Sequence, residues 1–237
     1  VGAGPAGLAC ATTLAGRGHQ VDLFERNDRI GGQFRLAMQI PGKEEFRETI
    51  RYFANQLDET GVKLHLETDA NFDLLKEYDE VIIASGVEPR KVELKGSNKS
   101  AKVIDYQTLI KEKTYLGDKI AIVGAGGIGI DVATMITEPE NYQLDDWLHD
   151  WGIDKEMAHP GGLYPYPDSF SDKEVWVLQR RKGRVGKGPG KTAGWIHKRT
   201  LEKRGVNLMG GVEYQAITDE GLQIKYGGES MLIHADS

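Results

Sequence analysis

Residues 1–7 (VGAGPAG) decide the fold at the start of the chain. Their spacing is Gly-x-Gly-x-x-Gly: the first glycine makes a tight turn, the second admits a pyrophosphate, and the third lets a helix pack on a strand. Residues 5–17 have the apolar spacing of a helix, with Pro5 in its first turn. Such a helix offers free amides and a positive dipole to phosphates. The motif therefore predicts a dinucleotide-binding turn.

An acidic residue follows this turn at the distance that a nucleotide site requires. The next predicted strand runs from Gln20 to Glu25, and Glu25 lies 18 positions after Gly7. A carboxylate at a strand end accepts hydrogen bonds from a ribose diol. The alternative interpretation is a glycine-rich turn followed by a solvated acid. Turn, helix, strand and acid together favour dinucleotide binding.

A second motif, GAGGIG at residues 124–129, follows the predicted strand KIAIV at 119–123. A helix is predicted from this motif to about residue 137. The chain therefore contains two βα units of the same kind. We expect Gly124, Gly126 and Gly129 to take the three roles of the motif glycines.

The second unit differs from the first at the end of its next strand. That strand, EVWVLQ at 174–179, ends in Arg180, Arg181 and Lys182 instead of an acid. A guanidinium can hold a 2′-phosphate through two parallel hydrogen bonds. The strand end therefore predicts NADPH rather than NADH; the alternative is a solvated basic loop.

The remaining pattern predicts an α/β fold with two Rossmann-like dinucleotide-binding domains and a small antiparallel β element. We expect a boundary at residues 100/101, within the polar stretch 90–102, and an insertion at 138–173 in the second domain. Other predicted elements are a helix at 43–60 that ends at Gly61, strands at 62–66 and 80–84, a helix that ends near Arg204, and short antiparallel strands within 206–233.

Composition excludes several classes of function. The net charge is −6, so no overall basic field favours nucleic acid or a membrane surface, and no apolar run approaches the length of a membrane span. The single cysteine, Cys10, excludes an internal disulfide framework, a Cys-rich zinc site and an all-Cys iron–sulphur cluster. We expect a cytoplasmic protein with no metal site of its own. Because the chain opens on the motif without a preceding strand, we also expect sequence before Val1.

Five further stretches, together with GAGPAG, carry a family resemblance. GAGPAG, then GGQF at 31–34, IPGKEEF at 40–46 and ASGVEPR at 84–90 resemble the flavin domain of the two-dinucleotide flavoproteins. LQRR at 178–181 and GKTAGWIH at 190–197 are similar to one branch of these, the bacterial NADPH-dependent 2,4-dienoyl-CoA reductases.

The resemblance implies which residues contact which coenzyme. Residues 1–100 would be the FAD domain, whose closing segment would follow Ser237, and residues 101–237 the NADPH domain. Motif and resemblance together assign to FAD the residues Gly2, Gly4, Ala6, Gly7, Glu25, Gly32, Gln33, Lys43, Ala70, Ser85 and Gly86. They assign to NADPH the residues Gly124, Gly126, Gly129, Arg180 and Arg181.

The resemblance also implies a larger enzyme, which acts in the β-oxidation of unsaturated fatty acids. Such reductases carry FMN in a (β/α)8 barrel like that of old yellow enzyme, followed by a four-iron cluster and the FAD and NADPH domains. Electrons pass from NADPH through FAD and the cluster to FMN, which reduces the dienoyl thioester. This chain would be the electron-input part, with the iron–sulphur and FMN domains as its partner and with no catalytic side chain of its own.

Two alternatives remain open at the level of sequence. One is a related flavoenzyme on the same framework, of the enoate reductase or amine dehydrogenase type. The other is a structural domain that keeps the nucleotide folds without turnover. A dithiol enzyme is excluded, because the disulfide reductases of this fold carry a CxxxxC pair and this chain has one cysteine.

Overall fold

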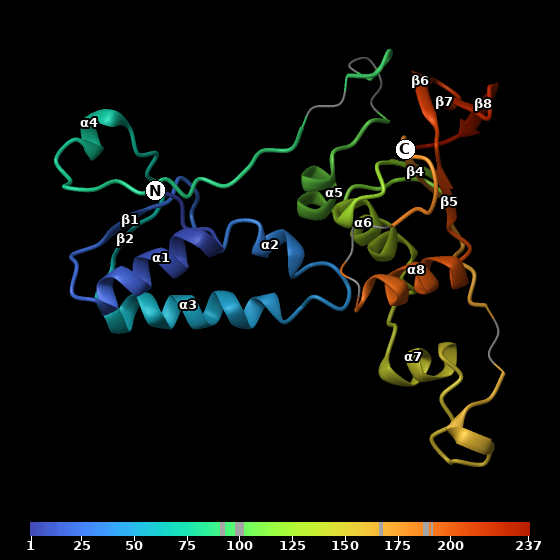
Figure 1. Ribbon diagram of the computed structural model, residues 1–237, viewed down its shortest axis with the longest axis horizontal. Helices are drawn as coiled ribbons and strands as arrows, with labels where there is room; N and C mark the ends of the chain where they lie inside the picture. Colours follow the sequence, from blue (N-terminus) through green and yellow to red (C-terminus); the bar gives the residue numbers. More distant parts are fainter. Residues whose placement is uncertain (91–92, 98–101, 166–167, 187–189, 191) are drawn as a thin grey trace. The chain divides into compact units, whose positions relative to one another are not determined.

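A computed structural model describes residues 1–90, 93–97, 102–165, 168–186, 190 and 192–237. The chain divides into two compact units, Val1–Lys91 and Val92–Ser237 (Figure 1). The predicted boundary at 100/101 lies outside the described residues. Lys95 already forms a β-bridge with Ala216 of the second unit. The chain has therefore entered the second unit by residue 95.

The first unit is a two-stranded parallel sheet covered by helices. Figure 1 shows α1 and α3 side by side, and they pack on each other over the sheet. Its core contains the buried residues Ala3, Leu8, Ala11, Leu23, Ile30, Leu57 and Val62. Its elements are α1 (Pro5–Gly16), β1 (Asp22–Phe24), α2 (Phe34–Ala37), α3 (Phe46–Thr60), β2 (Lys63–His65) and α4 (Phe72–Leu75).

Local sequence signals account for the helix ends in this unit. The helix α1 begins at Pro5, whose fixed φ suits a first turn and whose missing N–H costs no helical hydrogen bond there. The helix α3 ends at Gly61, which adopts φ +70 in the left-handed region as a C-terminal glycine does. It begins at Phe46, three residues later than the predicted start at 43.

The predicted strand at 80–84 does not form as a regular strand. Its backbone still pairs with the first residue of the chain: the Val1 ammonium donates to the Ile82 carbonyl at 2.7 Å, and the Ala84 N–H donates to the Val1 carbonyl at 2.8 Å. A strand needs a ladder of such bonds along its length. In the described residues the ladder partner of this segment is Val1 alone, which is too short to define a strand.

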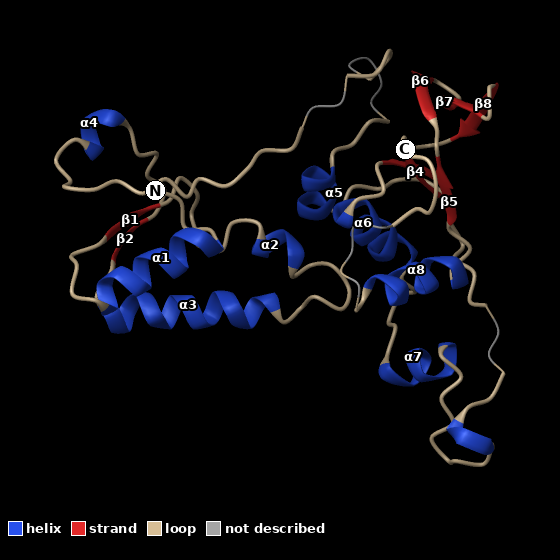
Figure 2. Ribbon diagram, viewed as in Figure 1, coloured by secondary structure: helices blue, strands red, loops and turns tan. Residues whose placement is uncertain are grey.

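The second unit contains a three-stranded parallel sheet of order β3-β4-β5, shown with the other strands in Figure 2. Its strands are β3 (Lys119–Val123), β4 (Glu174–Gln179) and β5 (Asn207–Gly210). The strand β5 pairs parallel to β4, so the prediction of antiparallel strands throughout 206–233 is wrong for its first part. The later part is confirmed: β6 (Glu213–Thr218), β7 (Gly221–Tyr226) and β8 (Glu229–His234) form an antiparallel sheet.

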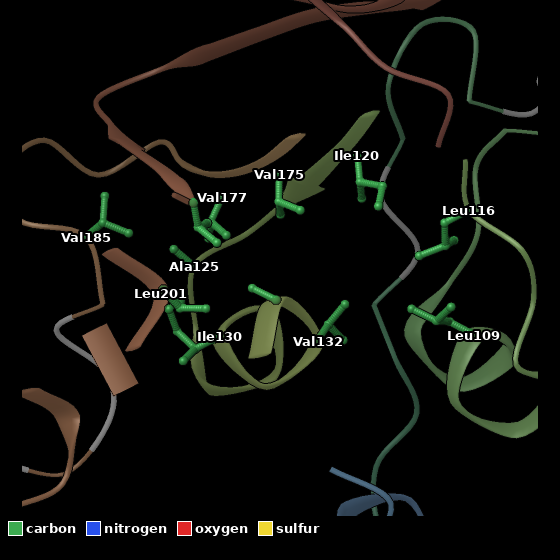
Figure 3. Close-up of a cluster of buried hydrophobic side chains, with 12 residues drawn as sticks. Leu109, Leu116, Ile120, Ala125, Ile130, Val132, Val175, Val177, Val185 and Leu201 are labelled. Atoms are coloured by element: carbon green, nitrogen blue, oxygen red, sulfur yellow. The ribbon is translucent and has the colours of Figure 1, made fainter. Parts of the chain in front are cut away.

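The strand β4 is buried on both faces, and its alternating side chains divide between two cores. Val175 and Val177 pack with side chains from α5 (Tyr106–Glu112), α6 (Gly127–Thr137) and α8 (Gly194–Lys203), as Figure 3 shows. Trp176 and Leu178 belong to a second cluster, with residues of the antiparallel sheet. The parallel sheet is thus covered by helices on one face and by the antiparallel sheet on the other. This is the α/β architecture that the sequence predicts.

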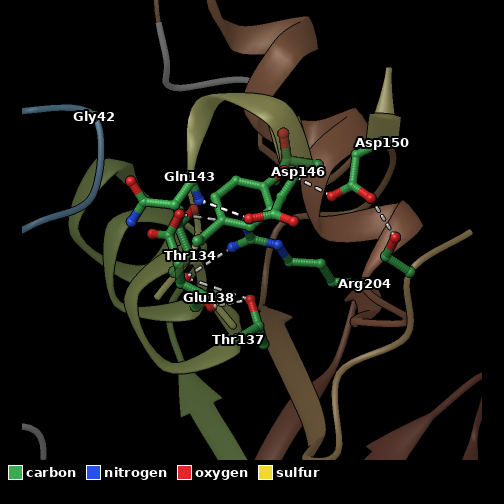
Figure 4. A network of polar contacts seen from close by, with 12 residues as sticks. Gly42, Thr134, Thr137, Glu138, Gln143, Asp146, Asp150 and Arg204 are labelled. Carbon is green, nitrogen blue, oxygen red and sulfur yellow. Dashed lines mark hydrogen bonds and ion pairs between the residues drawn. The ribbon is translucent and has the colours of Figure 1, made fainter. Parts of the chain in front are cut away.

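A polar network ties the segment between α6 and β4 to the rest of the second unit (Figure 4). This segment contains the helix α7 (Leu144–Asp150) and a short 3-10 turn, η1 (Pro160–Gly162). Arg204, 5% exposed, donates to the Thr134 carbonyl at 3.1 Å and to the Glu138 carboxylate at 3.4 Å. Its guanidinium also lies 5.4 Å from the ring centre of Tyr142, at the start of the segment.

No helix in the described parts of the chain is long and apolar enough to cross a membrane. Among the same residues, no group of three or more His, Cys, Asp or Glu side chains is placed to hold a metal ion.

Candidate coenzyme-binding sites

The first glycine turn has no room for side chains at two of its three glycines. Gly2 adopts φ +98, and a Cβ there would lie 2.4 Å from the Ala84 carbonyl oxygen. A Cβ on Gly7 would lie 1.8 Å from the Gly2 carbonyl oxygen. Gly4 is different: the nearest atom to its Cβ position is the Gly32 Cα, at 4.0 Å. The open position is the one at which a pyrophosphate approaches the backbone.

The second glycine turn matches the first at its second and third glycines, whereas no atom lies within 4 Å of the Cβ position of its first glycine, Gly124. Gly124 adopts φ +119, and a Cβ on Gly129 would lie 1.9 Å from the Gly124 carbonyl oxygen. No atom lies within 4 Å of the Cβ position of Gly126. In both motifs the first glycine has a positive φ, the second is open and the third has no room for a side chain; their contact with a pyrophosphate stays a prediction.

Each turn leads directly into a helix whose first backbone amides are not capped by a side chain. Gly4 precedes α1 and Gly126 precedes α6, both with extended backbone and no capping side chain. The first N–H groups of a helix have no partner within it and bind anions readily. In α1 the first of these groups is that of Ala6, because Pro5 has no N–H.

A second turn closes on the first in the N-terminal unit. The Gly31 N–H donates to the Ala3 carbonyl at 2.8 Å, and Gly32, at φ +48, lies directly against Gly4. This contact places the exposed Gln33 beside the start of α1. Ser85 approaches from the other side, with its Cα 3.1 Å from the Cβ position of Gly2. The structure thus brings together five of the residues assigned to FAD: Gly2, Gly4, Gly32, Gln33 and Ser85.

Glu25 is buried and held in place, which contradicts the alternative of a solvated acid. It is 6% exposed. Its Oε2 accepts the Ala3 N–H at 2.8 Å, and its Oε1 accepts the backbone N–H of Asn27 at 2.9 Å as well as the side-chain amide of Asn27. A carboxylate has about four acceptor sites. One site therefore remains for a hydroxyl, and Asn27 is a contributor that sequence reasoning missed.

Three further residues assigned to FAD lie at the edge of this cluster or beyond it. The Thr68 N–H donates to the Glu25 carbonyl at 2.9 Å. Ala70 lies two residues beyond this contact in the sequence. Gly86, at φ +78, is exposed and adjoins Ser85. Lys43 lies in the turn between α2 and α3, and its assignment rests on the resemblance alone.

The second unit carries a cluster of cations at the end of β4. We define the basic loop as residues 180–184; its cations Arg180, Arg181, Lys182 and Arg184 are all exposed. Within the described residues none of the four forms an ion pair. The Gly124 N–H donates to the Leu178 carbonyl at 2.9 Å, so the loop starts two residues from the glycine turn.

The residues around the basic loop are well packed. The Gln179 side-chain amide donates to the Arg181 carbonyl at 2.9 Å, while the Gln179 carbonyl accepts the N–H groups of Gly211 and Val212. Beneath the strand, the Tyr214 hydroxyl donates to the Leu178 carbonyl at 2.9 Å. Burial raises the pKa of Tyr214 to about 12, and the positive charge of Arg180 opposes this rise.

Two duplicated glycine turns on parallel sheets define a class, the domains that bind pyridine and flavin nucleotides. The sequence pattern of the pyridine nucleotide-disulphide oxidoreductases matches residues 1–237. The chain belongs to this family, whose domains bind FAD and NAD(P), and it is an oxidoreductase domain.

Similar proteins are larger than this chain. It is 27% identical to a metal reductase of Desulforamulus reducens, over 100% of this chain and 36% of that protein. It is also 27% identical to a cinnamate reductase of Clostridium sporogenes, over 100% of this chain and 31% of that protein. Among solved structures, a 2-naphthoyl-CoA reductase complex matches 99% of this chain and 31% of its own, with 29% identity and a TM-score of 0.76. The chain thus spans about a third of these relatives.

Proposed function

We propose that the first unit binds FAD, that the second binds NADPH, and that the chain passes reducing equivalents from NADPH to FAD. When bound, NADPH supplies a hydride and FAD accepts it. The single observation that carries the proposal is the contrast between two matching glycine turns. A buried carboxylate, Glu25, follows the first, and four exposed cations, none of them in an ion pair within the part of the chain that the structure describes, follow the second.

The residues of the first unit suit a flavin nucleotide. The open space at Gly4 and the free amides of α1 would receive the pyrophosphate. Glu25 would accept a ribose hydroxyl at its remaining acceptor site, with the Ala3 N–H and Asn27 keeping its carboxylate in orientation. Gly32, Gln33 and Ser85 would line the same turn, and Lys43, Ala70 and Gly86 would contact parts of FAD farther away.

The residues of the second unit suit a phosphorylated coenzyme. The amides that follow Gly126 would bind the pyrophosphate. Arg180 and Arg181 would bind the 2′-phosphate with charge-assisted hydrogen bonds, since no acidic partner in the described residues occupies them. We assign acid–base chemistry to no side chain of this chain: its residues would bind and orient the two coenzymes, which carry the reaction.

For the whole enzyme we propose the electron-input part of a 2,4-dienoyl-CoA reductase. Support comes from the flavin-domain motifs, the stretches LQRR and GKTAGWIH, and a relative that acts on an aromatic CoA thioester by its name. The iron–sulphur and FMN domains of the parent chain would take the electrons. An enoate reductase of the same framework is the second candidate, favoured by the cinnamate reductase among the relatives.

Anaerobic titration of the FAD-loaded chain tests the proposal. NADPH should bleach the visible flavin band, and NADH should do so much less efficiently. Absence of bleaching at saturating NADPH would overturn hydride transfer. Equal efficiency of the two coenzymes would overturn the phosphate role of Arg180. The variant Arg180→Ala should weaken NADPH and spare NADH, because it removes a contact that only the 2′-phosphate makes.

A further inference from the structure

One side chain folds the basic loop back on itself. The Gln179 side-chain amide donates to the Arg181 carbonyl at 2.9 Å and reaches the Arg184 carbonyl at 3.5 Å. The two carbonyls belong to the first and last parts of the loop. A single carboxamide nitrogen therefore bridges the backbone on either side of Lys182 and Gly183.

The end of β5 forms the floor of the loop. A Cβ on Gly210 would lie 2.5 Å from the Gly183 carbonyl oxygen, 3.2 Å from the Arg181 carbonyl oxygen and 3.2 Å from the Gln179 amide nitrogen. The backbone of Gly210 has no positive φ, so alanine is conformationally allowed there. Space alone forbids it. Only hydrogen on this α-carbon lets the loop settle onto the sheet.

Gln179 and Gly210 thus hold the basic loop through its backbone carbonyls. The cations of the loop form no ion pair within the described residues. A loop that is fixed before a ligand arrives loses less entropy on binding and presents its charges in one arrangement. We propose that Gln179 and Gly210 are positioning residues that hold the basic loop where its cations bind a 2′-phosphate, and that they set the preference for NADPH over NADH. This inference rests on the proposed function of the second unit.

The test is calorimetric titration of the chain with NADP⁺ and with NAD⁺. Gln179→Met keeps the length of the side chain and removes the N–H donors, whereas Gly210→Ala displaces the loop without changing a charge. Each should raise the Kd for NADP⁺ about fivefold to tenfold, the effect expected when a displaced loop loses one or two hydrogen bonds to the 2′-phosphate. The Kd for NAD⁺ should stay within about twofold, because NAD⁺ lacks the phosphate.

Gln223→Met is the matched control, since Gln223 is an exposed glutamine on β7 and should change neither affinity. If wild type binds both coenzymes equally, the proposed NADPH specificity fails and the positioning role fails with it. If wild type prefers NADP⁺ and Arg180→Ala removes that preference while both positioning variants keep it, the inference alone is overturned. Equal losses for NADP⁺ and NAD⁺ in both variants would reveal a merely structural role and would also overturn it.

Discussion

The two glycine turns are alike at their second and third glycines, but the strand ends that follow them differ in burial and in the sign of their charge. Gly7 and Gly129 each lie close to the carbonyl of the first glycine of their motif, so that an added Cβ would lie 1.8 and 1.9 Å from that oxygen. After the first turn the strand end is buried and acidic, at Glu25. After the second it is exposed and basic, in the basic loop. In the proposed function, the turn binds the pyrophosphate and the strand end selects the nucleotide.

The comparison also separates two ways of fixing a charge. Glu25 is held directly, because its own oxygens accept hydrogen bonds from Ala3 and Asn27. The cations of the basic loop are held indirectly, through their backbone carbonyls. A buried carboxylate needs such partners to offset desolvation. Exposed guanidinium groups are solvated and need only a fixed backbone, so they remain available to a phosphate.

The largest expected effect comes from filling the second turn. Gly129→Ala would place a methyl group against the Gly124 carbonyl, so the turn must open and the second unit should lose about 3 kcal/mol of stability. NADP⁺ binding should disappear in titration while FAD binding persists. Gly127→Ala in the same helix, where the Cβ position is open, should change stability by less than about 1 kcal/mol. Loss of FAD binding in Gly129→Ala would show that the two turns do not act independently.

The second unit also differs from the first in the Arg204 network, which ties down the segment between α6 and β4. Arg204→Met should lower the free energy of unfolding of this unit by roughly 3 kcal/mol, because it removes a buried guanidinium that donates to the Thr134 carbonyl and the Glu138 carboxylate. Urea denaturation measures this. Arg199→Met is the control, since Arg199 is 42% exposed and its loss should cost less than about 0.5 kcal/mol. Equal effects would contradict the role of burial.

Removing the charge of the acid tests the first strand end. In Glu25→Gln an amide group replaces one oxygen, so either the Ala3 N–H or Asn27 faces another donor. FAD affinity should fall roughly tenfold to a hundredfold, as measured by flavin fluorescence titration. NADP⁺ affinity should not change. A parallel fall in NADP⁺ affinity would argue that Glu25 supports the whole chain rather than one coenzyme.

The smallest expected effect concerns Tyr214, whose hydroxyl donates to the Leu178 carbonyl near the end of β4. The strand end at Glu25 has no such tyrosine contact among the described residues. Its pKa rises from 10.0 to about 12 on folding because the hydroxyl is buried. The unfolded chain therefore ionises first, and the stability of the second unit should fall as the pH rises from 10 to 12. Tyr214→Phe should flatten this part of the pH profile in urea denaturation. An unchanged slope in the variant would assign the alkaline loss to other groups.

Sequence reasoning predicted the turns well because their determinants are local. Each motif fixes one turn and one helix start within about ten residues. Its glycines are a strong signal for a tight turn, because glycine adopts positive φ readily. The strand at 80–84 and the direction of β5 depend on which segment lies alongside, and the residue pattern of a strand does not specify its partner. Both predictions failed for that reason.

The supporting residues of the two strand ends were harder to find. Asn27 and Gln179 act through hydrogen bonds to groups that become neighbours only after folding, so their types and positions gave no signal. Gly210 gave a weak one: glycine near a strand end indicates close approach of another backbone. Glu25 and Arg180 were recognisable because each lies at the end of the strand that follows its glycine motif.

The central claim is that each coenzyme belongs to one unit. Hydrogen–deuterium exchange of the chain with FAD alone and with NADP⁺ alone tests it directly. FAD should slow exchange in peptides covering residues 2–8 and 25–34 and leave the second unit unchanged. NADP⁺ should slow exchange in peptides covering residues 124–130 and 179–186 and leave the first unit unchanged. Protection of the first turn by NADP⁺, or of the second by FAD, would contradict the assignment of coenzymes by strand end.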